Sequence, residues 1–183
     1  GRTALLLALA GRFALSGGTL SVEGRSRPAQ IRRRFTVAQA EPAIGLDDHH
    51  TVGDAIKETI TVSGKAATAA NIRAWLDRLG VDVDTGDAVG LLPRFERIRF
   101  AIACAAASRT PALVVDDADT GLNGAGGERV FETLRAFADA GQLVVAACAR
   151  HDPTADIVLD LRTRSTARTP DLAAGRGRNG DAP

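Results

Sequence analysis

The stretch Ala112–Asn123, with the sequence ALVVDDADTGLN, decides the fold that we expect for this chain. It begins with four consecutive apolar residues, Ala112 to Val115, and continues into two adjacent carboxylates, Asp116 and Asp117. An uninterrupted apolar run of this kind is typical of a strand buried on both faces of a parallel sheet. Open α/β sheets bind their ligands at the carboxyl ends of such strands. The stretch therefore predicts either a core strand followed by a solvated acidic turn, or a strand that delivers carboxylates to a ligand.

Length and composition indicate one globular domain. The chain has 183 residues, of which 45% are hydrophobic, and a formal net charge of +1. A chain of this length can bury a sizeable core, and its near-neutral charge predicts no nucleic-acid partner. No stretch approaches the roughly 20 apolar residues that span a bilayer. The two cysteines, Cys104 and Cys148, lie in apolar runs, which predicts small buried thiols in a reducing compartment.

Candidate helices and strands alternate along the chain, as judged from the spacing of apolar residues and from Gly and Pro positions. Before the central stretch we expect a helix at Thr3–Phe13, strands at Thr19–Val22 and Phe35–Ala38, a loop or short exposed helix at Arg25–Arg34, and helices at Val52–Ile60, Ala69–Leu79 and Phe95–Ala107. After it we expect an amphipathic helix at Glu128–Ala140 and buried strands at Leu143–Ala147 and Ile157–Leu161. This order predicts an α/β fold with a parallel sheet, since helices separate its strands.

Domain boundaries follow from the same pattern. We expect one folded domain over residues 1–161, with a helical insert at about 47–107. Residues 162–183 are rich in Arg, Thr, Gly and Pro and have little to bury, which predicts a disordered tail. At the other end, Thr3–Ala10 (TALLLALA) has two interpretations, a buried helix or the apolar part of a signal peptide. The helix is favoured, because only Arg2 supplies charge before the run.

Several short motifs occur in a set order: Gly1-Arg2-Thr3-Ala4 before an apolar helix, Gln39 at the end of a strand, the helical insert, the acidic strand, and Thr120-Gly121-Leu122-Asn123. This order resembles the ATP-binding cassette of ABC transporters over nearly all of residues 1–161. The resemblance implies a P-loop NTPase-like parallel sheet flanked by helices, with a helical subdomain. It also implies ATP and Mg²⁺ as cofactors.

The segment Gly1 to Ala4 resembles the end of the Walker A motif of that family. In such loops, N–H groups at a helix N-terminus cradle phosphates, a lysine reaches the β- and γ-phosphates, and a hydroxyl binds Mg²⁺. The resemblance therefore implies phosphate binding by Gly1, Arg2, Thr3 and Ala4, and Mg²⁺ binding by Thr3. Arg2 stands at the lysine position, where its planar guanidinium keeps the charge but not the shape.

The acidic pair resembles the Walker B motif, followed by the family's D-loop at Thr120–Asn123. Asp116 matches the aspartate that holds Mg²⁺ through water. Asp117 stands where the family has a catalytic glutamate, and its reach is about 1.5 Å shorter, a displacement that can cost about 10²-fold in rate. Gln39, in VAQAEP, matches the glutamine that contacts Mg²⁺ and the attacking water. From the residues alone, the favoured interpretation of Gln39 is a polar residue that ends a strand.

Two other motifs of the family are altered. Leu92–Glu96 (LPRFE) stands at the place of the LSGGQ signature, ahead of a well-matched segment at 97–103. Pro93 and Phe95 remove the backbone access that the signature glycines give. The switch histidine would fall near Ala149, with His151-Asp152 two residues later, which favours loss of the histidine. A metal site at the adjacent His49 and His50 is not favoured, because suitably spaced further ligands are missing.

Two functions follow from the resemblance. In the first, the chain is the ATP-binding subunit of an ABC-type transporter, which pairs with a second cassette and docks on a permease membrane subunit at the inner, cytoplasmic face of the cell membrane. Asp117 and Gln39 would then support slow ATP hydrolysis, and Thr3, Gln39 and Asp116 would hold Mg²⁺. In the alternative, the chain is a degenerate, non-hydrolysing cassette with a structural or regulatory role.

Overall fold

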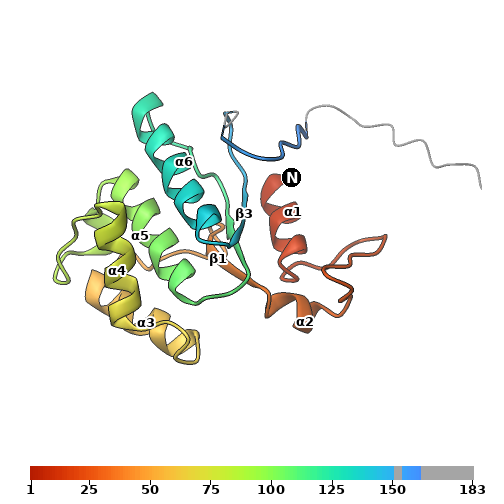
Figure 1. The fold of residues 1–183 in the computed structure, drawn as a ribbon, viewed down its shortest axis with the longest axis horizontal. Helices are drawn as coiled ribbons and strands as arrows, with labels where there is room; N and C mark the ends of the chain where they lie inside the picture. Colours follow the sequence, from red (N-terminus) through yellow and green to blue (C-terminus); the bar gives the residue numbers. More distant parts are fainter. Residues whose placement is uncertain (151–153, 162–183) are drawn as a thin grey trace, which may run out of the picture.

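A three-stranded parallel sheet forms the centre of the protein. The computed structural model describes residues 1–150 and 154–161. Within them the strands β1 (Phe35–Gln39), β2 (Ala112–Val115) and β3 (Leu143–Ala146) pair in the order β1-β2-β3, all parallel (Figure 1). Every residue of the central strand β2 is buried. The expected α/β class, and the expected bounds of the central strand, are confirmed.

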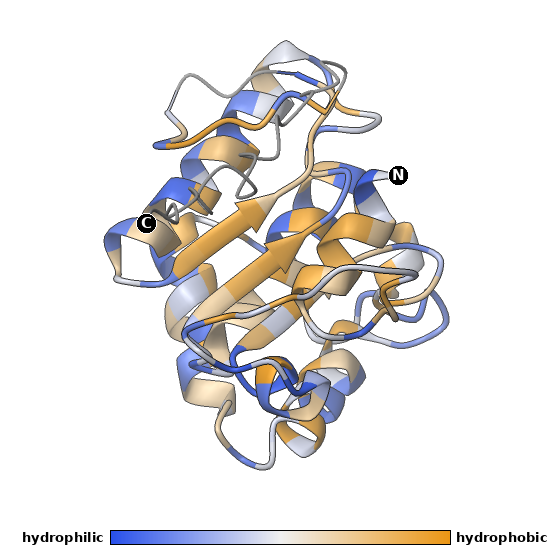
Figure 2. Ribbon diagram, turned by 90° about the vertical axis from the view of Figure 1, so that its right-hand side faces the viewer, coloured by the Kyte–Doolittle hydropathy of each residue, from blue (hydrophilic) through white to orange (hydrophobic). Residues whose placement is uncertain are grey.

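Helices cover both faces of the sheet. On one face, α1 (Arg2–Leu9) and α2 (Pro28–Arg32) pack on a cluster that includes Val37 and Val114. On the other face, α5 (Arg94–Ala107) and α6 (Gly124–Asp139) pack on a cluster that includes Leu113. Successive residues of a strand point to opposite faces, so an unbroken apolar run serves both layers. In Figure 2 the strands accordingly form a continuous hydrophobic band.

The helical segment between β1 and β2 has an apolar cluster of its own. It contains α3 (Val52–Val62), α4 (Ala69–Leu79), a 3-10 turn at Val89–Leu91 and α5. The cluster is formed by Val52, Ile72, Leu76, Val89, Phe100 and their neighbours. One side of α5 lies in this cluster and the other side packs on the sheet. We therefore retain the proposal of a helical subdomain at about 47–107.

Local signals set the ends of these helices, although α3 runs to Val62 and not to the predicted Ile60. The Thr51 side chain caps α3 by accepting the Asp54 N–H at 3.1 Å, and its hydroxyl donates to the Asp54 carboxylate at 2.8 Å. The Thr68 side chain caps α4 in the same way, and α4 ends where Gly80 adopts a left-handed φ of 60°. A residue with a side chain rarely adopts that conformation, so glycine is well suited to the position. The predicted bounds of α4 are therefore confirmed.

Two predicted helix boundaries are wrong, each for a local reason. The first helix ends at Leu9, not Phe13, because Gly11 turns the chain with a φ of 68°. The helix after the central strand begins at Gly124, not Glu128, because the Asn123 side chain caps it by accepting the Gly126 N–H at 2.8 Å. Helix α2 matches the short-helix alternative at Arg25–Arg34, although it buries Ile31.

Two predicted strands are absent from the described residues, and a third differs in burial. Thr19–Val22 forms a single bridge between Val22 and Arg25 and has no neighbouring strand. Ile157–Leu161 forms no strand, and Ile157 is 81% exposed, since its side chains find no packing surface. Strand β3 ends at Ala146, and Leu143 is 60% exposed because β3 pairs only with β2 in this part of the chain.

The remaining predictions concern the cysteines and the tail. Cys104 is fully buried, as predicted, whereas Cys148 lies only half-buried after β3. Residues 162–183 lie outside the described residues, so the predicted tail stays a prediction. Across residues 1–150 and 154–161, none of the helices combines the length and hydrophobicity that crossing a bilayer requires.

Candidate functional site

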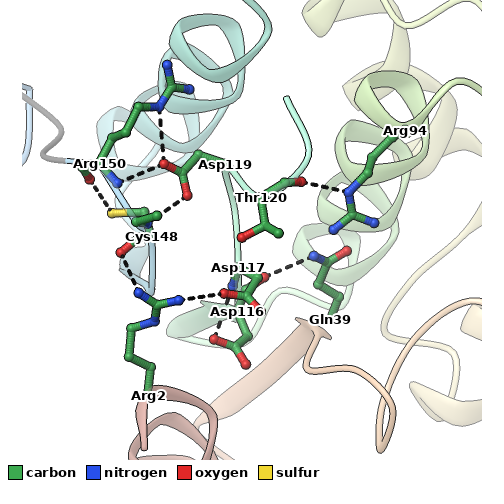
Figure 3. Close-up of polar contacts among 10 residues, drawn as sticks. Arg2, Gln39, Arg94, Asp116, Asp117, Asp119, Thr120, Cys148 and Arg150 are labelled. Carbon is green, nitrogen blue, oxygen red and sulfur yellow. Dashed lines mark hydrogen bonds and ion pairs between the residues drawn. The ribbon is translucent and has the colours of Figure 1, made fainter. Parts of the chain in front are cut away.

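Arg2 connects the start of α1 with the carboxyl edge of the sheet. Gly1 is the N-cap of α1, and Arg2, Thr3 and Ala4 form its first turn. The Arg2 guanidinium reaches the Asp117 carboxylate, with Nη2 3.1 Å from Oδ1 (Figure 3). Its other terminal nitrogen, Nη1, donates to the carbonyl oxygen of Cys148 at 3.4 Å. The ends of α1, β2 and β3 therefore meet at one place, as the sequence predicts for Arg2 and Asp117.

The two adjacent carboxylates play different structural parts. Asp116 is 2% exposed, and its Oδ1 accepts the main-chain N–H of Asp117 at 3.0 Å. Asp117 adopts a left-handed φ of 45°, and 44% of its side chain is exposed. Aspartate tolerates this conformation better than most residues do. The turn thus keeps one carboxylate inside the protein and presents the other to solvent beside Arg2.

Gln39 is fixed against the same turn. It is the last residue of β1, is 6% exposed, and donates from Nε2 to the Asp116 carbonyl at 2.9 Å. The register between β1 and β2 shifts just before it, so that Gln39 lies opposite Val115. Such irregularities at the end of a strand re-aim a side chain. The structure therefore brings Gln39 next to Asp116, as expected of two groups at one edge of a sheet.

Asp119 is a buried member of this cluster that the sequence reasoning missed. Its Oδ1 accepts the Ala149 N–H at 2.8 Å, and its Oδ2 accepts the Arg150 N–H at 2.8 Å and Arg150 Nε at 3.2 Å. Only 1% of the side chain is exposed. Burial raises the pKa of Asp119, but these hydrogen bonds outweigh it and hold the pKa below its usual value. The available signal was an acidic residue four positions after the strand, in a stretch that was otherwise interpreted as a turn.

Arg150 covers the first turns of α6. Its guanidinium occupies the space in which a side chain on Gly127 would begin, because a Cβ there would overlap it. Nη2 also lies 3.5 Å from the carbonyl oxygen of Asn123, the N-cap of α6. A cation is unfavourable at a helix N-terminus, so the adjacent Asp119 carboxylate is needed to hold the guanidinium there. Gly127 makes this close approach possible.

The LPRFE stretch begins α5 and touches the turn after the acidic pair. Pro93 is the N-cap of α5, and Arg94 Nε donates to the Thr120 carbonyl at 2.8 Å (Figure 3). The Arg94 side chain lies within 3.3 Å of a Cβ placed on Gly121. Leu91, just ahead of the stretch, is 85% exposed. The Thr120–Asn123 turn is thus held by Asp119 at its start and by Arg94 along its main chain.

Two predicted histidine features have different outcomes. Ala149, the expected place of the switch histidine, contributes its main-chain N–H to Asp119, while His151-Asp152 lies outside the described residues. His50 lies 3.5 Å from a Glu58 carboxylate oxygen and 4.0 Å from an Asp47 carboxylate oxygen. Within the described ranges, no three His, Cys, Asp or Glu side chains gather in a way that could hold a metal ion on their own.

Sequence comparison finds relatives among transport proteins. No family model matches the chain. It is 29% identical over 180 residues to an ABC transporter ATP-binding protein of Streptomyces avermitilis, across 96% of this chain. It is 30% identical over 153 residues to the ABC transporter patM of Penicillium expansum, across 77% of this chain. The chain spans 30% of the length of the first relative and 10% of that of the second.

Structure comparison identifies the fold. The protein cbiO1 of Clostridium perfringens, part of the ABC transporter complex cbiONQ, matches with a TM-score of 0.65 at 16% identity, over 83% of this chain and 63% of its own. An ABC transporter ATP-binding protein of Pyrococcus furiosus matches with a TM-score of 0.66 at 15% identity, over 84% of this chain and 75% of its own. The chain has the fold of the ABC ATP-binding cassettes. Its parallel sheet is the P-loop NTPase sheet of that fold.

The groups at the sheet edge of this domain fit a nucleotide with Mg²⁺. The N-terminal turn of α1 supplies free N–H groups, and Arg2 adds a guanidinium that can bind phosphate oxygens. Mg²⁺ is usually held by one or two carboxylates together with substrate phosphates. One oxygen of Asp116 accepts the Asp117 N–H, which leaves the carboxylate with acceptor capacity for a metal-bound water. The donor set is therefore suitable for ATP.

Proposed function

We propose that this cassette binds ATP with Mg²⁺ and acts as the ATP-binding part of an ABC-type transporter. The observation that carries the proposal is the 3.1 Å contact between Arg2 in the first turn of α1 and Asp117 at the end of β2, beside buried Asp116. A helix N-terminus, a cation and two carboxylates at one sheet edge are the groups that a metal-bound triphosphate requires. The names of the two sequence relatives agree with this function.

Each residue of the edge has a proposed part. Gly1, Arg2, Thr3 and Ala4 bind phosphates through main-chain N–H groups and the guanidinium. Thr3, Gln39 and Asp116 hold Mg²⁺, directly or through water. Mg²⁺, when bound, supplies positive charge that stabilises the phosphate oxygens. Asp117 orients water and accepts its proton, with Gln39 alongside, once Nη2 of Arg2 has exchanged Asp117 for the phosphates.

The partners belong to the proposal as well. One of the matching structures is part of a complex, cbiONQ, described as an ABC transporter. We infer that this cassette likewise pairs with a second cassette and docks on a permease membrane subunit, at the cytoplasmic face of the cell membrane. The altered LPRFE stretch then faces the partner with Pro93 and Phe95 in place of signature glycines. A site on the partner that needs this stretch would hold nucleotide and turn over poorly.

Calorimetric titration of the chain with ATP tests the proposal, first with Mg²⁺ and then with EDTA. We expect binding that is tighter with Mg²⁺. Arg2→Ala should weaken it under both conditions, because the guanidinium acts on phosphates. Asp116→Asn should remove mainly the Mg²⁺ effect, because the carboxylate acts on the metal. Absence of binding at millimolar ATP would overturn the proposal.

Steady-state phosphate release separates an ATPase from a cassette that only binds. A slow turnover that disappears in Asp117→Asn supports hydrolysis at this site. Asp139→Asn is the matched control, since Asp139 is an exposed aspartate of α6 that pairs with Arg135. If turnover is equal in all three proteins, it comes from a contaminant, and the cassette is a non-hydrolysing partner.

A further inference from the structure

We propose that Asp119 is a positioning residue of the nucleotide site, because it holds the main chain after β3 so that the Cys148 carbonyl anchors the guanidinium of Arg2. The inference rests on the proposed function, since it assigns the anchored Arg2 to phosphate binding. It adds a residue that neither the Walker A nor the Walker B resemblance includes. Figure 3 shows the chain of contacts from Asp119 through the segment after β3 to Arg2.

The first step is the hold that Asp119 has on this segment. Both of its carboxylate oxygens are used by main-chain N–H groups, from Ala149 and Arg150, at 2.8 Å each. Charged acceptors make short, strong hydrogen bonds to main-chain donors. With 1% of the side chain exposed, water competes little for these oxygens. One buried carboxylate therefore holds the main chain at both Ala149 and Arg150.

The second step concerns the charge beside it. The Arg150 guanidinium lies against the first turn of α6 at Gly127, in the positive end of the helix dipole. Arg150 Nε lies 3.2 Å from Asp119 Oδ2, and this ion pair offsets the unfavourable position. The carboxylate thus fixes the main chain and the side chain of Arg150 together. Without the carboxylate, the Arg150 guanidinium would move away from the N-terminus of α6, and the main chain after β3 would move with it.

The third step is the difference between the two partners of Arg2. Asp117 is an anion, so an incoming phosphate competes with it for Nη2. The Cys148 carbonyl is neutral and accepts from the other terminal nitrogen, Nη1, so it can keep its hydrogen bond while Nη2 changes partner. Arginine has five donors in a fixed planar arrangement, which permits both contacts at once. A side chain that is anchored beforehand loses less freedom on binding a ligand.

The test compares Asp119→Asn with Asp139→Asn, each in the native background and in the Arg2→Ala background. The asparagine oxygen can accept one of the two main-chain N–H groups, but its NH₂ group is a donor and cannot accept the other. The main chain at Ala149 and Arg150 therefore loses one of its two hydrogen bonds to this side chain. The Arg2 guanidinium signal in a ¹⁵N spectrum without nucleotide, assigned by its loss in Arg2→Ala, reports the anchor directly. The dissociation constant for ATP in EDTA, from calorimetry, reports its effect on binding.

We expect Asp119→Asn to shift or broaden the Arg2 signal and to weaken ATP binding about threefold to tenfold, as for one lost hydrogen bond. In the Arg2→Ala background the same substitution should change the affinity less than about twofold, whereas Asp139→Asn should change nothing in either. A purely structural role would weaken binding equally in both backgrounds. That result, or an unchanged Arg2 signal, overturns the inference.

Two outcomes are kept apart by this design. If the native chain binds no ATP, the proposed function fails, and the Arg2 signal still decides whether Asp119 positions the guanidinium. If Asp119→Asn does not fold, Asp119→Ser serves the same comparison, because its hydroxyl can accept one of the main-chain N–H groups. With either variant, an Arg2 signal identical to that of the native chain contradicts the inference.

Discussion

The pairing of Arg2 with Asp117 joins two groups that the proposed function uses separately. Both side chains are about half exposed. In the ion pair, the arginine that would bind phosphate is bound to the aspartate that would orient water. An exposed ion pair contributes only about 0.2–1 kcal/mol. Phosphate can therefore break it at small cost, and the pair is a resting arrangement of the site.

A substitution of Asp117 should accordingly strengthen nucleotide binding when Mg²⁺ is absent. Asp117→Asn frees the guanidinium and removes a negative charge near the phosphates, which predicts about two- to fivefold tighter ATP binding in EDTA. Calorimetric titration measures the change. In the Arg2→Ala background the gain should be smaller, because only the charge effect remains. Equal or weaker binding in Asp117→Asn would show that the ion pair does not compete with nucleotide.

The buried carboxylate of Asp119 should make the stability of the protein depend on pH. Its folded pKa is lowered, and an unfolded aspartate has a pKa of about 3.9. Its contribution is therefore complete above that pH and is lost as the pH falls through the folded pKa. We expect the native protein to be more stable than Asp119→Asn at pH 7, with a difference that shrinks below about pH 4. Thermal denaturation of both proteins between pH 7 and 3 measures this, and a constant difference would contradict it.

At the scale of elements, the N-terminus of α6 accommodates a side chain from another segment, that of Arg150. Its cap is Asn123, the last residue of the turn that resembles the D-loop, and its first turns contain four residues without long side chains, Gly124–Gly127. Glycine is normally unfavourable inside a helix. Here the absence of a side chain at Gly127 lets the Arg150 guanidinium lie against the helix. The glycines misled the sequence reasoning, which read them as a break before the helix.

A pair of alanine substitutions tests this arrangement. A Cβ on Gly124 would lie 4.0 Å from the Arg150 guanidinium, whereas a Cβ on Gly127 would overlap it. Alanine favours a helix by about 1 kcal/mol over glycine, so Gly124→Ala should be neutral or stabilising. Gly127→Ala must displace the terminal nitrogens of the guanidinium from the helix, and we expect it to be less stable than Gly124→Ala by about 1 kcal/mol. Urea denaturation gives both values, and a more stable Gly127→Ala would contradict the expectation.

At the scale of the whole molecule, the sequence predicted what local patterns encode. The apolar run Ala112–Val115 and the amphipathic spacing of Ala69–Leu79 are complete within their own segments, so both elements were placed correctly. Strands depend on neighbours. Thr19–Val22 and Ile157–Leu161 have strand-like composition, yet the described part of the chain offers no paired strand for either. Composition alone does not reveal such a missing neighbour.

The candidate site was predictable only where a motif names its residues. Arg2, Gln39, Asp116 and Asp117 belong to matched motifs, and the structure brings them to one edge. Asp119 belongs to no motif that we used. Its role depends on main-chain N–H groups about thirty residues away, at Ala149 and Arg150. Nearly every residue has a main-chain N–H group, so the sequence contains no pattern that marks these two. Only the fold shows which N–H groups reach the carboxylate.

The two thiols report on the opening of the whole domain. Cys104 lies on the side of α5 that is buried in the helical cluster, and burial raises its pKa to about 12. Cys148 is half-buried beside the candidate site. We expect a disulfide reagent at pH 8 to label Cys148 readily and Cys104 only when the domain unfolds, because thiolate is the reactive form. Two rapidly reacting thiols in the native protein would show that the helical cluster opens independently.

Strand β3 has a consequence for how the domain behaves in solution. Within residues 1–150 and 154–161 it pairs on one side only, and its sequence LVVA carries no charge. The other side leaves main-chain N–H and C=O groups in a row, which is the usual starting point for strands of separate molecules to join. Native proteins cover such an edge strand or place charged residues on it, which prevents aggregation. Self-association of the isolated chain would therefore begin at this edge strand rather than at the nucleotide edge.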